Sequence, residues 1–147
     1  MLQEPQIQLS SGPVHLKFDK IVSFEPGGEL VPYYHYKISL DDGTVVGHIN
    51  LRVGDTRHVN LVAGHVGFEI AEEHRGHAYS LHACRALQPL VKKHYDRVVL
   101  TADPDNAASL RIIEKLGAHF LSEGEVPPDD PAYASGIRRK KRFVWTV

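Results

Sequence analysis

A short basic turn between a predicted strand and a predicted helix carries the residue types that would bind an anion. Residues 67–79 read Gly-Phe-Glu-Ile-Ala-Glu-Glu-His-Arg-Gly-His-Ala-Tyr. Where the helix must begin, the first backbone N–H groups have no acceptor within the helix, and the helix dipole is positive. Gly76 permits a close main-chain approach or a positive φ, and Ala78 keeps the turn slim. The turn therefore predicts a site for a phosphate or pyrophosphate.

Two common phosphate-binding motifs are absent from the chain. The dinucleotide fingerprint needs three spaced glycines and the P-loop needs Gly-Lys-Ser/Thr, and neither pattern occurs. Residues 73–78 instead resemble the acyl-CoA motif of the GNAT superfamily of N-acetyltransferases, Gln/Arg-x-x-Gly-x-Gly/Ala. The match is at Gly76 and Ala78, and Glu73 replaces the usual first residue. Taken alone, this segment is also compatible with an ordinary strand-to-helix turn.

A second block strengthens the resemblance. Residues 101–117 read Thr-Ala-Asp-Pro-Asp-Asn-Ala-Ala-Ser-Leu-Arg-Ile-Ile-Glu-Lys-Leu-Gly. This resembles the Asn-x-x-Ser helix and the Glu-Lys-Leu-Gly ending of the same superfamily, and both blocks stand in family order. The resemblance implies an α/β fold of GNAT type over residues 1–147 as a single domain. Its sheet would be mixed and mostly antiparallel, with a splayed central pair of parallel strands flanked by helices.

The resemblance also implies the cofactor. Acetyl-CoA would be the co-substrate, and no metal would be required. Its pantetheine amides would bond to the main chain of the strand before the turn, its pyrophosphate to the N–H groups of the turn, and its thiol end would lie near Asn106. The implied CoA-binding residues are Phe68, Ile70, Ala71, Arg75, Gly76, His77, Ala78, Tyr79, Ser80 and Asn106.

Direct acyl transfer from a thioester to an amine requires aligned reactants, a neutral amine and protonation of the departing thiolate. Many GNAT members have a Tyr four residues after the small residue of Asn-x-x-Ala/Ser, but Ile113 stands there. Ser109 is the candidate acid in its place, as in the branch that resembles ribosomal-protein N-terminal acetyltransferases. Glu69 is the leading candidate base and His65 the second, because residues two or four apart share one strand face. Two non-catalytic alternatives stay open. The hydroxyl of Ser109 would bond only to the helix backbone, and the carboxylate of Glu69 would simply be solvated.

The acceptor side departs from the family pattern. One or two helices usually follow the first strand and form part of the acceptor pocket, but only residues 25–32 stand in that place. We therefore expect a shortened N-terminal helical region, with an acceptor side that is open or completed by a second subunit of a homodimer. Tyr34, Tyr36 and Tyr133 are candidate acceptor contacts. The expected acceptor is an amine-bearing small molecule or a protein N-terminus.

Residue patterns predict the elements that position these groups. Strands are predicted over residues 14–24, 33–40, 45–52, 61–71, 97–101 and 118–125, with a last strand after a Pro-rich loop at 127–136. An apolar repeat through Leu81, Leu87 and Val91 predicts a helix after the turn, with a kink or an early end at Pro89. A second helix would be capped by Asp105 or Asn106 and end at Gly117.

Composition limits the remaining functions. A formal charge of −1 over 147 residues gives no global basic field, so nucleic acid is an unlikely partner. The chain shows no secretory signal and no apolar run of about 18 residues, which predicts a cytoplasmic protein that does not enter membranes. Its ten histidines form no His-Glu-x-x-His motif, and the lone Cys84 falls on the apolar helix stripe. Two alternatives stay open: a non-catalytic acyl-CoA sensor, and an RNA- or ribosome-associated module that uses the basic run at 138–142.

Overall fold

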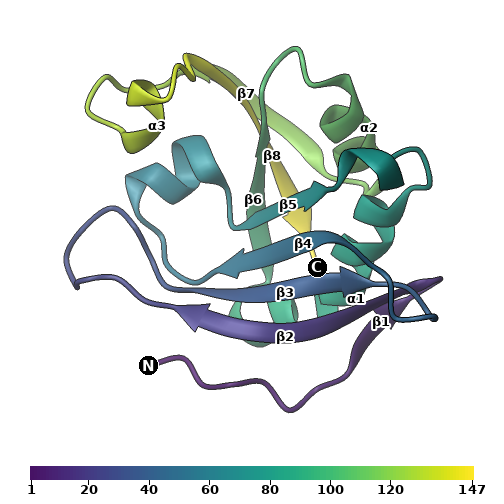
Figure 1. Ribbon diagram of the computed structural model, residues 1–147. Helices are drawn as coiled ribbons and strands as arrows, with labels where there is room; N and C mark the ends of the chain where they lie inside the picture. Colours follow the sequence, from purple (N-terminus) through teal and green to yellow (C-terminus); the bar gives the residue numbers. More distant parts are fainter.

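Two β-sheets form the body of the protein. A computed structural model describes residues 1–147 and contains a five-stranded sheet with the order β1-β2-β3-β4-β5 and a three-stranded sheet with the order β6-β8-β7 (Figure 1). The strands are β1 (Leu9–Ser11), β2 (Val14–Val22), β3 (Tyr33–Ser39), β4 (Val45–Arg52), β5 (Val66–Ile70), β6 (Arg97–Ala102), β7 (His119–Glu125) and β8 (Arg139–Thr146). The helices are η1 (Val59–Ala63), η2 (Glu72–His74), α1 (Tyr79–His94), α2 (Ala107–Lys115) and α3 (Pro131–Ala134).

The larger sheet is an antiparallel meander whose two faces differ in polarity. Tyr36 of β3 lies opposite Ile49 of β4, and Ile49 lies opposite Phe68 of β5, so these side chains share one apolar face. The neighbouring row contains His48 and Glu69, which lie opposite each other on the other face. Because side chains alternate along a strand, one face joins the core and the other stays polar.

Helix α1 covers the apolar face of the larger sheet (Figure 1). It presents a stripe of small and branched residues that includes Cys84, Leu87 and Val91, each of which has no exposed surface. A cluster of 22 buried residues joins this stripe to the strands and to Trp145 of β8. The apolar repeat predicted from the sequence is therefore confirmed as the stripe that buries α1 against the sheets.

The two sheets part between β5 and β6. These strands are neighbours in the fold, yet they belong to different sheets, and Figure 1 shows β5 running across the view while β6 runs up it. The strands stay together only near the start of β5, where the N–H of His65 donates to the carbonyl of Val99 at 2.8 Å. The predicted splayed arrangement, flanked by helices, is confirmed. Residues 23–32, between β2 and β3, contain no helix, so the predicted shortening of the N-terminal region is confirmed too.

Three predicted elements need correction. Residues 61–71 do not form one strand, because the chain makes a π-helix at Val59–Ala63 and turns at Gly64 with φ +72° before β5 begins. Of the two outcomes predicted at Pro89, the early end does not occur, because α1 continues to His94; its buried stripe outweighs the one backbone bond that proline removes. The loop at 127–136 contains the short helix α3, which starts at Pro131 and is capped by Asp130.

Candidate cofactor and acceptor site

The turn before α1 is built as a cradle of free backbone donors. Gly76 has φ +92° and Ala78, the N-cap of α1, has φ +61°, so both residues adopt left-handed backbone conformations. The N–H groups of residues 76–80 donate to no backbone carbonyl of the protein. No side chain caps the helix either. These donors and the positive end of a helix of 16 residues therefore face the same opening.

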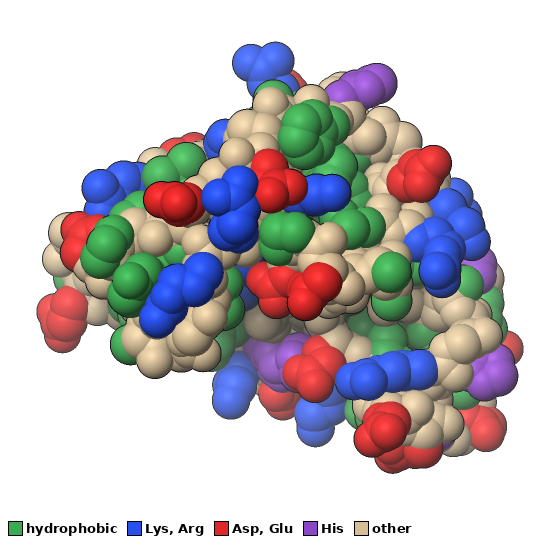
Figure 2. All heavy atoms as spheres, turned by 90° about the horizontal axis from the view of Figure 1, so that it is seen from above, with side chains coloured by type: hydrophobic (Ala, Val, Ile, Leu, Met, Phe, Trp, Pro, Cys, Tyr) green, Lys and Arg blue, Asp and Glu red, His purple; other side chains and the backbone are tan.

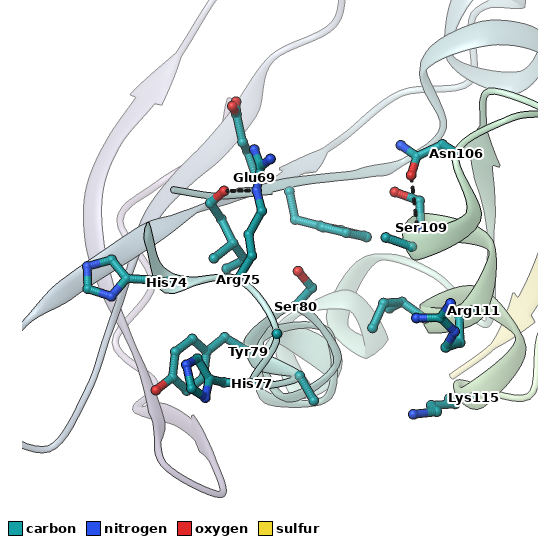
Figure 3. A pocket seen from close by; sticks show the side chains of 16 residues that line it. Glu69, His74, Arg75, His77, Tyr79, Ser80, Asn106, Ser109, Arg111 and Lys115 are labelled. Carbon is teal, nitrogen blue, oxygen red and sulfur yellow. Dashed lines mark hydrogen bonds between the residues drawn. The ribbon is translucent and has the colours of Figure 1, made fainter. Parts of the chain in front are cut away.

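This opening is a cavity of about 490 Å³ between the turn, β5 and α2. Figure 3 shows His77 and Tyr79 on one side of it and Arg111 and Lys115 on the other. The rings of His77 and Tyr79 stack with their centroids 5.2 Å apart. Arg111 and Lys115 were not predicted from the sequence, although their spacing of four residues places both on one face of a helix and could have indicated them. The cavity thus combines free N–H groups with cationic side chains.

The free edge of β5 forms one wall of this cavity. The N–H of Ala71 points toward β4 and donates to the carbonyl of Val46. The carbonyl of Ile70 points to the other edge of β5 and accepts from Nε of Arg75. Backbone groups of successive residues in a strand point to alternate edges. Phe68 and Ile70 therefore direct their N–H and C=O groups into the gap between β5 and β6. An extended chain with amide groups can bond there as an additional strand would.

The start of α2 brings Asn106 and Ser109 to the gap. Oδ1 of Asn106 accepts from the backbone N–H of Ser109 at 3.1 Å, which caps the helix as the sequence predicts (Figure 3). This bond leaves the amide NH₂ of Asn106 available as a donor. Oγ of Ser109 has no hydrogen-bond partner in the protein, and both residues are accessible from the cavity.

A second cavity, of about 300 Å³, opens on the other side of the gap. Phe68, Asn106 and Ser109 line both cavities, so the two spaces meet at these residues. The wall of the second cavity contains the charged side chains of Arg52, His58, Asp103 and Lys140. None of these four was predicted as a site residue. Arg52 and Lys140 belong to β4 and β8, whereas His58 precedes η1 and Asp103 follows β6. These segments are far apart in the sequence, and no local pattern marks the four residues.

His65 lines neither cavity. The residue is 2% exposed, and Nδ1 accepts from the backbone N–H of Val99 at 2.9 Å. A ring nitrogen that accepts from a backbone N–H cannot carry a proton, so the neutral ring has its proton on Nε2, which lies 3.0 Å from Oδ1 of Asp55. Both nitrogens are occupied, which leaves neither free to accept a proton from an amine.

Glu69 lies in the middle of β5 with 66% of its side chain exposed. Oε2 lies 3.9 Å from Nε2 of His48 on the neighbouring strand. Figure 3 shows its carboxylate pointing away from Ser80 and the turn. Glu69 lines the first cavity, whereas Gly67, two residues earlier on the same face of β5, lines the second.

The three tyrosines expected at the acceptor line neither of these two cavities. Tyr34 and Tyr36 are 4% and 2% exposed on the apolar face of β3, where burial raises the pKa of Tyr36 to about 12. The hydroxyl of Tyr34 instead contacts Nε2 of His94 at 3.1 Å. The ring of Tyr133 lies under the guanidinium of Arg138, whose Cζ is 3.7 Å from the ring centroid.

The basic run at residues 138–142, most of which forms the start of β8, is largely paired within the protein. Arg139 lies 3.0 Å from Glu123, Lys140 lies 2.9 Å from Asp103, and Arg142 donates to the carbonyl of Asn60 at 2.7 Å. On the face drawn in Figure 2, cationic side chains alternate with acidic ones and form no continuous basic surface. No helix of the protein has the length and apolar character needed to cross a membrane.

Comparisons with solved structures identify the fold. An acetyltransferase from Agrobacterium tumefaciens matches with a TM-score of 0.66 and 16% identity, over 100% of this chain and 98% of that one. RimL, the ribosomal L7/L12 alpha-N-protein acetyltransferase, matches with a TM-score of 0.58 and 15% identity over 78% of this chain and 61% of its own. The microcin C7 self-immunity acetyltransferase MccE, solved in complex with acetyl-CoA and AMP, matches with a TM-score of 0.60 and 14% identity. The match covers 78% of this chain and 61% of MccE. The chain thus spans about six tenths of the length of RimL and MccE.

The comparison of sequences is more specific. A model of the acetyltransferase (GNAT) domain matches residues 10–119, which is most of the chain and includes the basic turn, β5 and α2. The protein therefore belongs to the GNAT acetyltransferase family, as the sequence resemblance indicated. A search of curated proteins finds no match.

Proposed function

We propose that the protein transfers an acetyl group from acetyl-CoA to a primary amine by direct attack within a ternary complex. The observation that carries this proposal is the meeting of two cavities at Phe68, Asn106 and Ser109. One cavity suits a phosphate-bearing cofactor and the other leaves room for an acceptor. Family membership and the acetyl-CoA bound to MccE support the choice of cofactor.

The first cavity would hold coenzyme A. The free N–H groups of residues 76–80 would bind the pyrophosphate, with Arg111 and Lys115 adding charge-assisted bonds. The main-chain groups of Phe68 and Ile70 would bond the pantetheine amides and draw the thioester into the gap. Holding both reactants in line can supply roughly 7–11 kcal/mol of the barrier in the best intramolecular cases.

At the junction, three groups of the chain would act on the reacting atoms. The N–H of Phe68 would donate to the oxyanion that develops on the acetyl oxygen, and Oγ–H of Ser109 would donate to the departing sulfur. Glu69 would accept the amine proton, through water, from its side of β5. The C–S bond breaks as the C–N bond forms, and the products are the acetylated amine and CoA thiol. His65 has no part in these steps because both of its ring nitrogens are occupied.

The acceptor would be a small amine or a protein N-terminus. RimL acts by its name on the α-amino group of a ribosomal protein, which makes an N-terminal acceptor reasonable here. The lack of a helix between β2 and β3 leaves the acceptor side open to either class.

Calorimetry with CoA tests the cofactor assignment. Gly76→Val should weaken CoA binding at least about 10-fold, because a β-branched residue is strained at φ +92° and the cradle would lose its shape. Gly136→Val is the matched control, since Gly136 has φ +93°, equally open surroundings and no place in either cavity. If wild-type protein takes up no CoA, the proposal is wrong.

Release of CoA thiol from acetyl-CoA, measured with a panel of amines, separates the enzyme from its rival. A sensor would bind acetyl-CoA and release no thiol with any amine. An enzyme would show release that depends on the amine and yields its N-acetyl product in a mass spectrum.

A further inference from the structure

The second cavity contains one cation that no carboxylate balances. Nδ1 of His58 lies 2.8 Å from Oδ2 of Asp130, and Nζ of Lys140 lies 2.9 Å from Oδ1 of Asp103. Arg52 has no carboxylate within 4.0 Å and makes no ion pair. Unpaired charges are costly to remove from water, so a partly buried arginine without a partner indicates a missing counter-charge.

The guanidinium of Arg52 is held in one orientation. Nη1 donates to the carbonyls of Ala63 and Gly64, both at 3.2 Å. Nε and Nη2 make no bond within the protein. The edge that carries these two nitrogens is the one that can grip two oxygens of a carboxylate or phosphate side by side.

Gly67 makes this arrangement possible. A Cβ at Gly67 would lie 2.9 Å from Nη2 and 3.0 Å from Nη1 of Arg52, so the guanidinium lies directly against the glycine backbone on β5. Both residues line the second cavity. Burial lowers the pKa of Arg52, whereas nearby Tyr33 raises it, and this agrees with a cation that has been taken from water without compensation.

We infer that Arg52 is the anion-binding residue of the acceptor site and that the acceptor is a primary amine which also carries a carboxylate or a phosphate. The anion would bind the Nε–Nη2 edge of Arg52, and the amine would extend along β5 to the junction at Phe68 and Ser109. Neutral amines would lack this anchor. The inference rests on the proposed acetyl transfer and adds the chemical class of its acceptor.

Matched acceptors test the inference by kinetics. Comparing glycine with glycinamide as acceptors measures the contribution of the carboxylate. Comparing O-phosphoethanolamine with ethanolamine measures the contribution of the phosphate. In the wild type, the anionic member of at least one pair should have the higher kcat/KM, and the pair that shows it identifies the anion. Arg52→Gln should lower that value roughly 10- to 100-fold, the effect of losing a charged hydrogen-bonding partner, and leave the neutral member unchanged. Arg52→Lys should recover part of the loss, and Arg85→Gln, on the exposed face of α1, is the control.

A binding experiment decides the matter even if no acceptor in the panel is used. Acetate and inorganic phosphate are titrated separately into CoA-saturated protein while the backbone amides of Gly64 and Gly67 are followed by NMR. One of the two anions should shift these amides in the wild type and in Arg85→Gln, but not in Arg52→Gln. If neither anion shifts them while CoA is bound, the inference is wrong and the proposed transfer stands. Failure to bind CoA at all would instead contradict the proposed function.

Discussion

Val99 directs both of its main-chain groups to a single residue, His65. Its carbonyl accepts from the backbone N–H of His65 at 2.8 Å, and its own N–H donates to Nδ1 of the His65 ring at 2.9 Å. The imidazole thus takes the place of a neighbouring strand at the point where β5 and β6 part. The gap between β5 and β6, which contains the candidate site, begins at these two bonds between His65 and Val99.

His65→Leu should destabilise the protein and disturb the cleft. The change leaves the N–H of Val99 buried without an acceptor, which costs roughly 1–3 kcal/mol. Urea unfolding measures the loss, and calorimetry should show weaker CoA binding. Asp55→Asn is the control, because Asp55 is 69% exposed and its bond to Nε2 should contribute less than about 1 kcal/mol. Equal stability of His65→Leu and wild type would contradict the structural role of the ring.

Ser109→Ala separates catalysis from helix capping. The cap uses the backbone N–H of Ser109, which alanine retains, so the stability of α2 should not change. Loss of the hydroxyl should lower kcat by about 10²-fold if it donates to the leaving sulfur. The KM for acetyl-CoA should stay within a few-fold, since no other contact is removed. An unchanged kcat would show that another group, or water, protonates the thiolate.

Glu69→Gln tests the base. The amide cannot take a proton, so kcat/KM for the amine should fall by about 10²-fold near neutral pH. The deficit should shrink as the pH approaches the pKa of the amine, because the amine then arrives already neutral. A deficit that is constant over the whole pH range would contradict the assignment. His48→Gln, which removes the neighbour 3.9 Å away, should have a smaller effect.

Acid should weaken the fold through His94. Burial, with a smaller contribution from Lys93, lowers the pKa of His94 below its ordinary value. The unfolded chain then binds a proton more readily than the folded one as pH falls below about 6.5, so this part of the stability is present at higher pH and is lost on acidification. His94→Gln should flatten the change in urea midpoint between about pH 7.5 and pH 5. His119→Gln, at an exposed position, should leave the slope of the wild type.

Cys84 should be inert in the folded protein. Its side chain has no exposed surface, and burial raises the pKa of the thiol to about 12. A thiol reagent at about pH 8 should therefore label the protein only after unfolding. Cys84→Ala should cost about 1 kcal/mol and leave CoA binding intact. Rapid labelling of the native protein would contradict the packing of α1.

The parts of the fold and site that can be predicted from the sequence are those that depend on a single continuous segment of the chain. The turn at Gly76, the cap at Asn106 and the apolar stripe through Leu87 each depend on neighbours within a few residues. Their sequence patterns can therefore be recognised without knowledge of the fold. The family resemblance then supplies the order in which they assemble.

The parts that were missed depend on contacts between distant segments. The apolar run at 61–63 reads equally well as strand or helix, and its π-helix is set by bonds such as that from Thr101 Oγ1 to the carbonyl of Val62. Tyr34 and Tyr36 alternate correctly, but alternation does not tell which face α1 will cover. Arg52 can be recognised as a candidate site residue only from the fold, which places its guanidinium against Gly67 on the neighbouring strand.

The order β6-β8-β7 has a consequence for folding. Strand β8 follows β6 and β7 in the chain but lies between them, so the three-stranded sheet cannot form in its native order until β8 has joined it. The five strands of the larger sheet lie in chain order and all precede β6, so their pairing does not depend on β8. A chain truncated before β8 would therefore lose the three-stranded sheet and, under the proposed function, its affinity for coenzyme A.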